Sequence, residues 1–197
     1  MSDADGRRGD DERREHFRVK DEALVTYRAV DAAEGERIRA DAGLAWPNAF
    51  SLCSRLHEMR QDTTVLRRHA ERESSTFGRL VDQLDRKLDL VTEVLLAQEV
   101  TARGAQVLPV DVSAEGIGFT VSRSLPAEQL VETRLVFRST GLGLRTLGRV
   151  VYCQSDLHGG FCLGLTFEFL RDYDRELMVY HVLQRQSMLL RGGQYGS

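Results

Sequence analysis

The residues best suited to chemistry in this 197-residue chain lie in one short turn, Asp111-Val112-Ser113-Ala114-Glu115-Gly116. A carboxylate, a hydroxyl and a glycine form a polar cradle there, at the start of the alternating apolar run Ile117, Phe119 and Val121. The Asp111 carboxylate only accepts hydrogen bonds, so the cradle suits a ligand that presents N–H donors. Gly116 permits either a left-handed turn or a close backbone approach. The alternative for Asp111 and Ser113 is an ordinary turn before a strand.

A cationic segment far upstream, Arg13-Arg14-Glu15-His16-Phe17-Arg18, offers the complement to this cradle. A guanidinium group can fork onto a phosphate and can also stack on a purine plane. Arg14 and Arg18 are spaced to hold one ligand from two sides, with Arg13 immediately before them. A solvated run of charge is the alternative interpretation of these arginines. Together, segment and cradle suit a ligand with both anionic groups and donors.

The overall charge confines any anion site to a local patch. Lys and Arg number 27 against 30 Asp and Glu, which gives a net charge of -3. Such a chain lacks the basic field that non-specific binding of a nucleic-acid polymer requires. No apolar run approaches the roughly 20 residues that span a bilayer, and the N-terminus has no signal-peptide pattern. We therefore expect a cytoplasmic protein without membrane insertion.

The chain also lacks the patterns of a metal site or an enzyme. The histidines are scattered, and Cys53, Cys153 and Cys162 have no metal-ligand spacing, so reduced thiols are expected. Ser113 lacks the preceding glycine of a nucleophile elbow. The run Gly141-Leu142-Gly143 lies between two strands and not before a helix, which indicates a turn and not a phosphate loop. We expect no catalytic residue and no metal.

Short strands must position the two motifs. The first is predicted over residues 22–30, directly after the arginines. From residue 105 onward the apolar period is two, which predicts strands over 106–110, 116–122, 130–139, 142–154 and 161–169. Six antiparallel strands in short hairpins favour a small closed barrel, because closure removes exposed edges. A helix over 173–190 follows, so the fold class is α+β.

About seventy residues with a helical pattern separate the first predicted strand from the others. Residues 31–42 predict a short helix, and a second helix from about Pro47 to Ala70 carries apolar residues at heptad spacing. A third helix begins near Ser74 or Ser75, and its spacings of four and three define one apolar seam: Phe77, Val81, Leu84, Leu88, Val91 and Leu95. Flanking apolar residues widen this stripe, which suits a bundle better than a lone dimeric coiled coil.

The seam either packs on its own domain or joins copies of the chain. We favour oligomerisation, because these helices carry more apolar surface than a small domain can cover. The predicted organisation is a disordered tail (1–12), a barrel with its C-terminal helix (13–30 and 104–191), and a helical oligomerisation insertion (31–103).

These features together resemble the PilZ domain family, the bacterial receptors for cyclic di-GMP. The resemblance rests on Arg14-x-x-x-Arg18 preceded by Arg13, on Asp111-x-Ser113-x-x-Gly116, and on the predicted barrel with its C-terminal helix. It implies that Arg13, Arg14, Arg18, Asp111, Ser113 and Gly116 bind cyclic di-GMP, with Asp111 accepting from the guanine N1 and N2 donors. No cofactor other than this ligand is expected.

The insertion resembles the atypical, tetramer-forming branch of that family, in which heptad-bearing helices bundle the subunits. This implies a homo-oligomer, a tetramer or alternatively a dimer. The expected function is a receptor that couples ligand binding to oligomeric geometry or to affinity for a protein partner, in motility or biofilm control. The rival is an oligomeric scaffold that keeps the fold without the ligand. The two complete motif halves favour the receptor.

Overall fold

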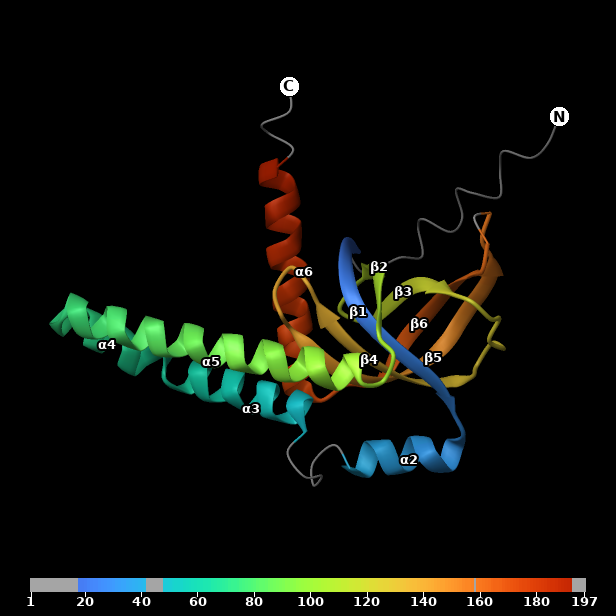
Figure 1. The fold of residues 1–197 in the computed structure, drawn as a ribbon, viewed down its shortest axis with the longest axis horizontal. Coiled ribbons are helices and arrows are strands. Elements are labelled where there is room, and N and C mark those ends of the chain that lie inside the picture. The colour runs from blue at the N-terminus through green and yellow to red at the C-terminus, as the bar shows by residue number, and fades with distance from the viewer. Residues whose placement is uncertain (1–17, 42–47, 158, 193–197) are drawn as a thin grey trace.

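The computed structural model describes residues 18–41, 48–157 and 159–192, and in these residues six strands close into a barrel with helices outside it (Figure 1). The strand order is β1-β2-β3-β6-β5-β4, and all neighbours are antiparallel. The strands are β1 (Val19–Val30), β2 (Gln106–Val112), β3 (Gly116–Val121), β4 (Leu130–Phe137), β5 (Gly143–Ser155) and β6 (Phe161–Phe169). The predicted six-stranded antiparallel barrel in an α+β fold is confirmed.

The period of two produces the core of the barrel. On β6, for example, Leu163, Leu165 and Phe167 are buried inside, while Cys162, Thr166 and Glu168 at alternate positions are exposed. β1 starts three residues before the predicted 22, and β2 continues two residues beyond the predicted 110. The reason is mutual pairing, since Val19 lies opposite Val112 and both side chains join the core.

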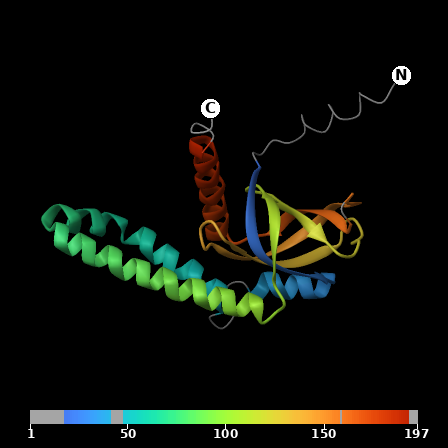
Figure 2. The same cartoon turned by 45° about the horizontal axis from the view of Figure 1, so that its top comes forward.

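The helical segment forms an arm that projects from the barrel, as two views show (Figures 1 and 2). The arm consists of α3 (Ala49–Asp62), α4 (Thr64–Glu73) and α5 (Ser75–Thr101), while α2 (Ala32–Asp41) lies against the outside of the barrel. The predicted single helix from 47 to 70 is wrong, because it is divided at Thr63. The Thr63 hydroxyl donates to the Met59 and Arg60 carbonyls, and the Thr64 hydroxyl also donates to Arg60. Such back-bonding bends helices.

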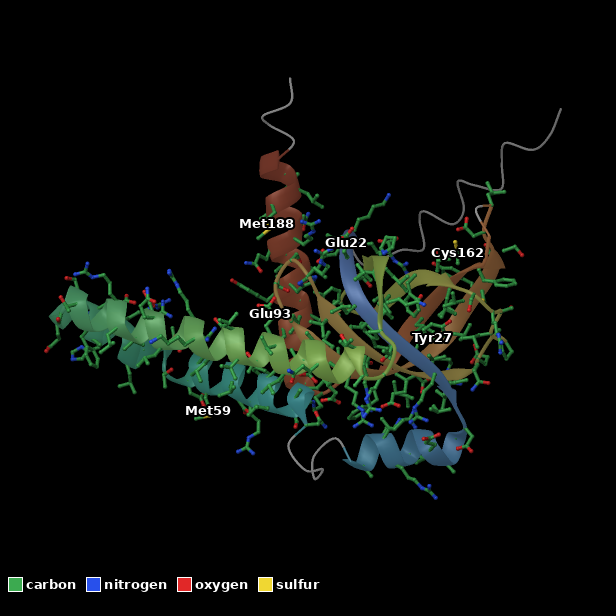
Figure 3. All side chains as sticks on the ribbon, viewed as in Figure 1. Glu22, Tyr27, Met59, Glu93, Cys162 and Met188 are labelled. Atoms are coloured by element: carbon green, nitrogen blue, oxygen red, sulfur yellow. The ribbon has the colours of Figure 1, made fainter. Side chains whose placement is uncertain are left out.

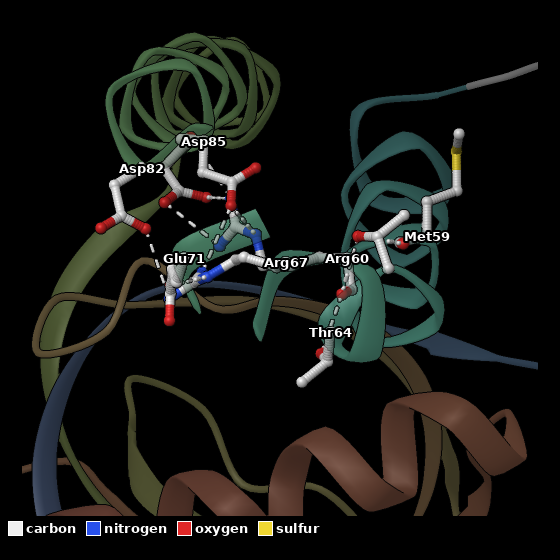
Figure 4. Close-up of polar contacts among 9 residues, drawn as sticks. Met59, Arg60, Thr64, Arg67, Glu71, Asp82 and Asp85 are labelled. Atoms are coloured by element: carbon white, nitrogen blue, oxygen red, sulfur yellow. Dashed lines mark hydrogen bonds and ion pairs between the residues drawn. The ribbon is translucent and has the colours of Figure 1, made fainter. Parts of the chain in front are cut away.

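At the tip of the arm, α4 and α5 are held together by ion pairs and by a close approach of the two helices. Arg67 of α4 pairs with Glu71 on its own helix and with Asp82 and Asp85 of α5 (Figure 4). At Gly78 a Cβ would lie 2.7 Å from the Glu71 Cγ, so the absence of a side chain lets α4 approach α5. The two helices therefore form a braced hairpin.

The base of the arm is held by apolar packing on the outer face of the barrel. Leu96 and Val100 of α5 and Phe50 of α3 form a buried cluster with Val136 of β4. Packing of the arm on its own domain, the alternative considered for the seam, thus involves the start of α3 and the last part of α5. No helix in the described part of the chain is long and apolar enough to cross a membrane.

A buried ionic cluster lies beside this apolar contact. The Glu132 carboxylate on β4 accepts from Arg28 at 2.5 Å, from Arg145 at 2.7 Å and from Arg134 at 3.1 Å. Glu132 is only 3% exposed. The cluster continues to the helices through Arg28 with Glu34 of α2, and through Arg134 with Glu99 of α5. Charged side chains therefore join the barrel to both α2 and the arm.

The C-terminal helix α6 (Asp172–Gly192) plugs one end of the barrel. Its Met178 and Val182 belong to the barrel core. Its outer half extends past the barrel, and Figure 3 shows Met188 on this free part. The fold thus offers a barrel end that is closed by α6 and an arm that leaves the barrel sideways.

Candidate functional site

Arg18 of the predicted clamp and the Asp111–Gly116 turn lie at the same end of two neighbouring strands, β1 and β2. In the β1–β2 pairing, Lys20 lies opposite Asp111. Continuation of this register places Arg18, just before β1, beside Ser113, just after β2. Arg13 and Arg14 lie outside the described residues, so Arg18 is the member of the predicted clamp whose position is known.

The Asp111 carboxylate faces outward and is open to a ligand. Its neighbours Val110 and Val112 point into the core, so Asp111 lies on the outer face of β2. It has neither a side-chain hydrogen bond nor an ion pair with any residue that the structure describes. Among the described residues this half-buried carboxylate is therefore an acceptor without a partner, and the exposed Lys20 lies opposite it on the adjacent strand. Lys20 was not predicted as part of the site.

The Ser113 side chain closes the turn between β2 and β3. Ser113 is buried, and its backbone N–H donates to the Gly116 carbonyl at 2.9 Å. Its hydroxyl accepts from the Glu115 N–H at 3.3 Å and lies 3.5 Å from the Gly116 carbonyl oxygen. This arrangement is the ordinary serine turn that was the alternative interpretation. Ser113 therefore shapes the loop between Asp111 and β3, and its contact with a ligand stays a prediction.

Gly116 is required for close packing of two strands. A Cβ at Gly116 would lie 2.4 Å from the Leu165 carbonyl oxygen of β6, closer than any side chain tolerates. Gly116 is not among the residues with a positive φ. Of the two reasons considered for this glycine, close backbone approach applies.

A row of outward-facing residues continues from Asp111 across the next strands. Gly118 of β3 lies opposite Asp111, Gly164 of β6 lies opposite Gly118, and Tyr152 of β5 lies opposite Gly164. A Cβ at Gly164 would lie 2.2 Å from the Tyr152 Cε1, and a Cβ at Gly118 would lie 3.5 Å from the Tyr152 hydroxyl. The tyrosine side chain thus reaches from β5 across β6 to β3. The sequence does not reveal this row, because cross-strand register cannot be read from it.

On the inner side of β1, next to Lys20, a buried polar network joins this end of the barrel to α6. The Asp21 carboxylate accepts from the Ser139 hydroxyl and lies 3.2 Å from the His181 Nε2 and 3.7 Å from the Arg185 Nε. The His181 Nδ1 lies 2.9 Å from the Thr140 hydroxyl. Burial lowers the pKa of His181, and the Asp21 carboxylate counteracts this in part. The buried ring is therefore neutral at neutral pH.

A cleft of about 390 Å³ lies where the arm, the β4–β5 loop and α6 meet. Its lining is mainly apolar and includes Met59, Leu88 and Tyr180, with Thr140 and His181 at the loop and α6. Cys53 also lines it, and burial raises the pKa of this thiol to about 11, which keeps it protonated. Within the described residues no group of His, Cys, Asp or Glu side chains is arranged to hold a metal ion.

The predicted oligomerisation residues lie along α5, and most of them face solvent. Phe77, Leu84, Leu88, Val91 and Leu95 are between 37% and 57% exposed, and Val81 is half-buried. A soluble monomer rarely exposes a contiguous stripe of this kind.

Comparisons with known proteins agree with this architecture. The model of the PilZ domain matches residues 66–184, a range that contains the Asp111–Gly116 turn and begins after the arginine segment. A pathogenic protein from Xanthomonas campestris, described as a tetrameric PilZ domain self-assembled via a helical bundle, has a similar fold, with a TM-score of 0.55. It is 16% identical, over 90% of this chain and 92% of that chain.

A second solved structure, the Bacillus subtilis inhibitor of motility, aligns at 13% identity over 42% of this chain and 43% of that chain, with a TM-score of 0.37. A search of curated protein sequences found no match. The domain match nevertheless spans more than half of the chain and includes five strands of the barrel. The chain therefore belongs to the PilZ domain family.

Proposed function

We propose that this protein is a cyclic di-GMP receptor that transmits ligand occupancy to its helical arm or to a protein partner. The observation that carries the proposal is the open Asp111 carboxylate beside Arg18 and Lys20 on the outer face of the barrel. An acceptor next to cations suits a ligand that combines base donors with phosphates. Membership of the PilZ family supports the same class of ligand.

The bases and the phosphates of cyclic di-GMP would each have matching side chains in the protein. The guanine N1 and N2 donors would pair with the Asp111 carboxylate, an arrangement that adenine does not offer. The phosphates would lie toward Arg18 and Lys20, with Arg13 and Arg14 as further cations from the preceding segment. Guanidinium groups suit this task because they can bind a phosphate through two parallel hydrogen bonds.

The network around Asp21 supports a route from the site to the rest of the molecule. Asp21 follows Lys20 in β1 and contacts His181 of α6. His181 and Thr140 line the cleft that also contains Leu88 of the arm. A ligand that moves the start of β1 would therefore change contacts of α6 and of the β4–β5 loop.

The exposed seam of α5 supports a homo-oligomer. We propose a tetramer built on this helix, with a dimer as the alternative, because the wide apolar stripe suits four helices better than two. The Xanthomonas protein with the same fold is described as a tetramer assembled through a helical bundle.

Calorimetric titration with cyclic di-GMP and cyclic di-AMP tests the receptor. Arg18→Ala should weaken binding of cyclic di-GMP at least tenfold, since a charge-assisted contact contributes about 1.5–3 kcal/mol. Asp111→Ala should reduce the preference for cyclic di-GMP over cyclic di-AMP. Arg123→Ala is the matched control, because Arg123 is an exposed arginine beyond the opposite end of β3.

The rival function is a scaffold that oligomerises without the ligand. It is favoured by the exposed seam and by a family match that does not include the arginine segment. An oligomeric parent protein that binds no cyclic di-GMP would establish this rival. Unchanged affinity in both the Arg18→Ala and Asp111→Ala variants would instead show that the ligand binds elsewhere.

A further inference from the structure

On the outer face of the barrel next to Asp111, two neighbouring positions are glycines and therefore carry no side chain. Gly118 and Gly164 leave the backbone of β3 and β6 bare, and the Tyr152 ring from β5 covers both. Within the described part of the chain the Tyr152 hydroxyl has no hydrogen-bond partner, and the residue is half-buried. One face of the ring therefore lies on the sheet, and the ring is held there by packing and not by its hydroxyl.

The distance between this ring and Asp111 is suited to the size of a base. Neighbouring strands lie about 4.8 Å apart, so the backbones of β2 and β5 are separated by about 14 Å along the barrel surface. The Tyr152 side chain spans much of this distance, because its hydroxyl reaches the position of Gly118, directly opposite Asp111. A planar base whose edge meets the Asp111 carboxylate from the β3 side would lie over the phenol ring.

We propose that Tyr152 is the stacking surface for the base that Asp111 holds by its edge, so that the site extends from β2 to β5. This proposal rests on the proposed function. The carboxylate selects the edge of the base, and the ring supplies the dispersion contact to its face, which contributes on the order of tenfold in affinity for each base. Lys20 and Arg18 lie on the opposite side of Asp111, where the phosphates would be.

A purely structural role for Tyr152 is the competing explanation, because an aromatic ring that covers a cross-strand glycine also stabilises a sheet. The two roles differ in what they predict. Stabilisation of the sheet alone would change the melting temperature of a Tyr152 variant and leave ligand affinity unaltered. A stacking role changes affinity and also alters the environment of the ring when the ligand binds.

The test combines calorimetry with 19F NMR of protein labelled with 3-fluorotyrosine. The chain has 5 tyrosines, and the Tyr152→Phe variant assigns the Tyr152 resonance by its disappearance. We expect cyclic di-GMP to shift this resonance in the parent protein. Tyr152→Phe should bind within about twofold of the parent, and Tyr152→Leu about tenfold more weakly. Val151→Ala is the control, an exposed neighbour on the same strand that should bind like the parent.

The outcomes separate this proposal from the proposed function. A parent protein that binds cyclic di-GMP with an unmoved Tyr152 resonance, or a folded Tyr152→Leu variant with parental affinity, overturns the stacking role and leaves the receptor intact. A parent protein without calorimetric binding overturns both. Should Tyr152→Leu fail to fold, the resonance of the parent protein decides the matter by itself.

Discussion

Replacement of Glu132 by Gln removes the negative charge at the joint between the barrel and its helices. The side chain keeps its size, but Arg28, Arg134 and Arg145 lose the carboxylate that holds them together. Burial disfavours the charged form of Glu132, yet the arginines outweigh this effect and lower its pKa from 4.5 to about 2. The ionised carboxylate is therefore more stable in the folded than in the unfolded chain.

The size of the effect follows from this difference in pKa. At about 1.4 kcal/mol for each pH unit, the interval from 4.5 to about 2 corresponds to about 3 kcal/mol of unfolding free energy. Removal of one partner from a buried ionic cluster typically costs about 3–5 kcal/mol, which is consistent. Because the folded pKa is depressed, this stability is fully present above pH 4.5 and is lost as the pH falls toward 2.

Urea unfolding followed by circular dichroism measures the effect. At about pH 7 the Glu132→Gln variant should be about 3 kcal/mol less stable than the parent, and at about pH 3.5 the difference should narrow to about 2 kcal/mol. Glu168→Gln is the matched control, since Glu168 also pairs with two arginines, Arg39 and Arg149, but on the solvent side. Exposed pairs contribute at most about 1 kcal/mol. A Glu132→Gln deficit below about 1 kcal/mol, or one that does not narrow in acid, would refute the reasoning.

Three further predictions follow from single features. Gly116→Ala should lower the melting temperature strongly, because its Cβ would meet a carbonyl oxygen at 2.4 Å, whereas Gly118→Ala should be tolerated with its nearest neighbours at 3.5 Å. Since burial lowers the pKa of His181, the parent should lose unfolding free energy as the pH falls through about 6.5. A His181→Gln variant should lack this loss of stability in melts measured at different pH. A Leu84→Glu, Leu88→Glu double variant should have a smaller mass by light scattering than the parent. The control is a Gln83→Glu, Lys87→Glu variant on the same exposed stretch, which should keep the parental mass. A parent protein that is already monomeric would contradict the bundle.

Much of the barrel could be predicted from local patterns. Strands such as β6 alternate buried and exposed residues, and turn residues separate them, so each element is visible in its own stretch of sequence. The position of the Asp111 turn at the mouth of a strand was visible for the same reason. The division of the first arm helix at Thr63 was not, because it depends on hydroxyl bonds back to the preceding turn.

The features that were missed depend on register and on burial by distant segments. Glu132 appears on an outward position of β4, where a charged residue is expected to face solvent, but α2 and α5 cover that position. Tyr152 looks like one strand residue among many, and only the pairing of β5 with β6 places it over Gly164. A single sequence contains neither kind of information.

The chain order of the barrel has a consequence for the way it folds. The β2–β3, β4–β5 and β5–β6 hairpins each join residues close in sequence, such as Val112 with Ile117, whereas β1 pairs across about ninety residues, as Val19 does with Val112. Loops of this length close slowly, because their entropy is lost before the distant contacts form. The helices of the arm form from local contacts and shorten the effective distance between β1 and β2. We expect β1 to dock last, so that Arg18 and Asp111 come together only in the final step of folding. A nascent chain would then complete the face that we propose for ligand binding after the rest of the barrel has formed.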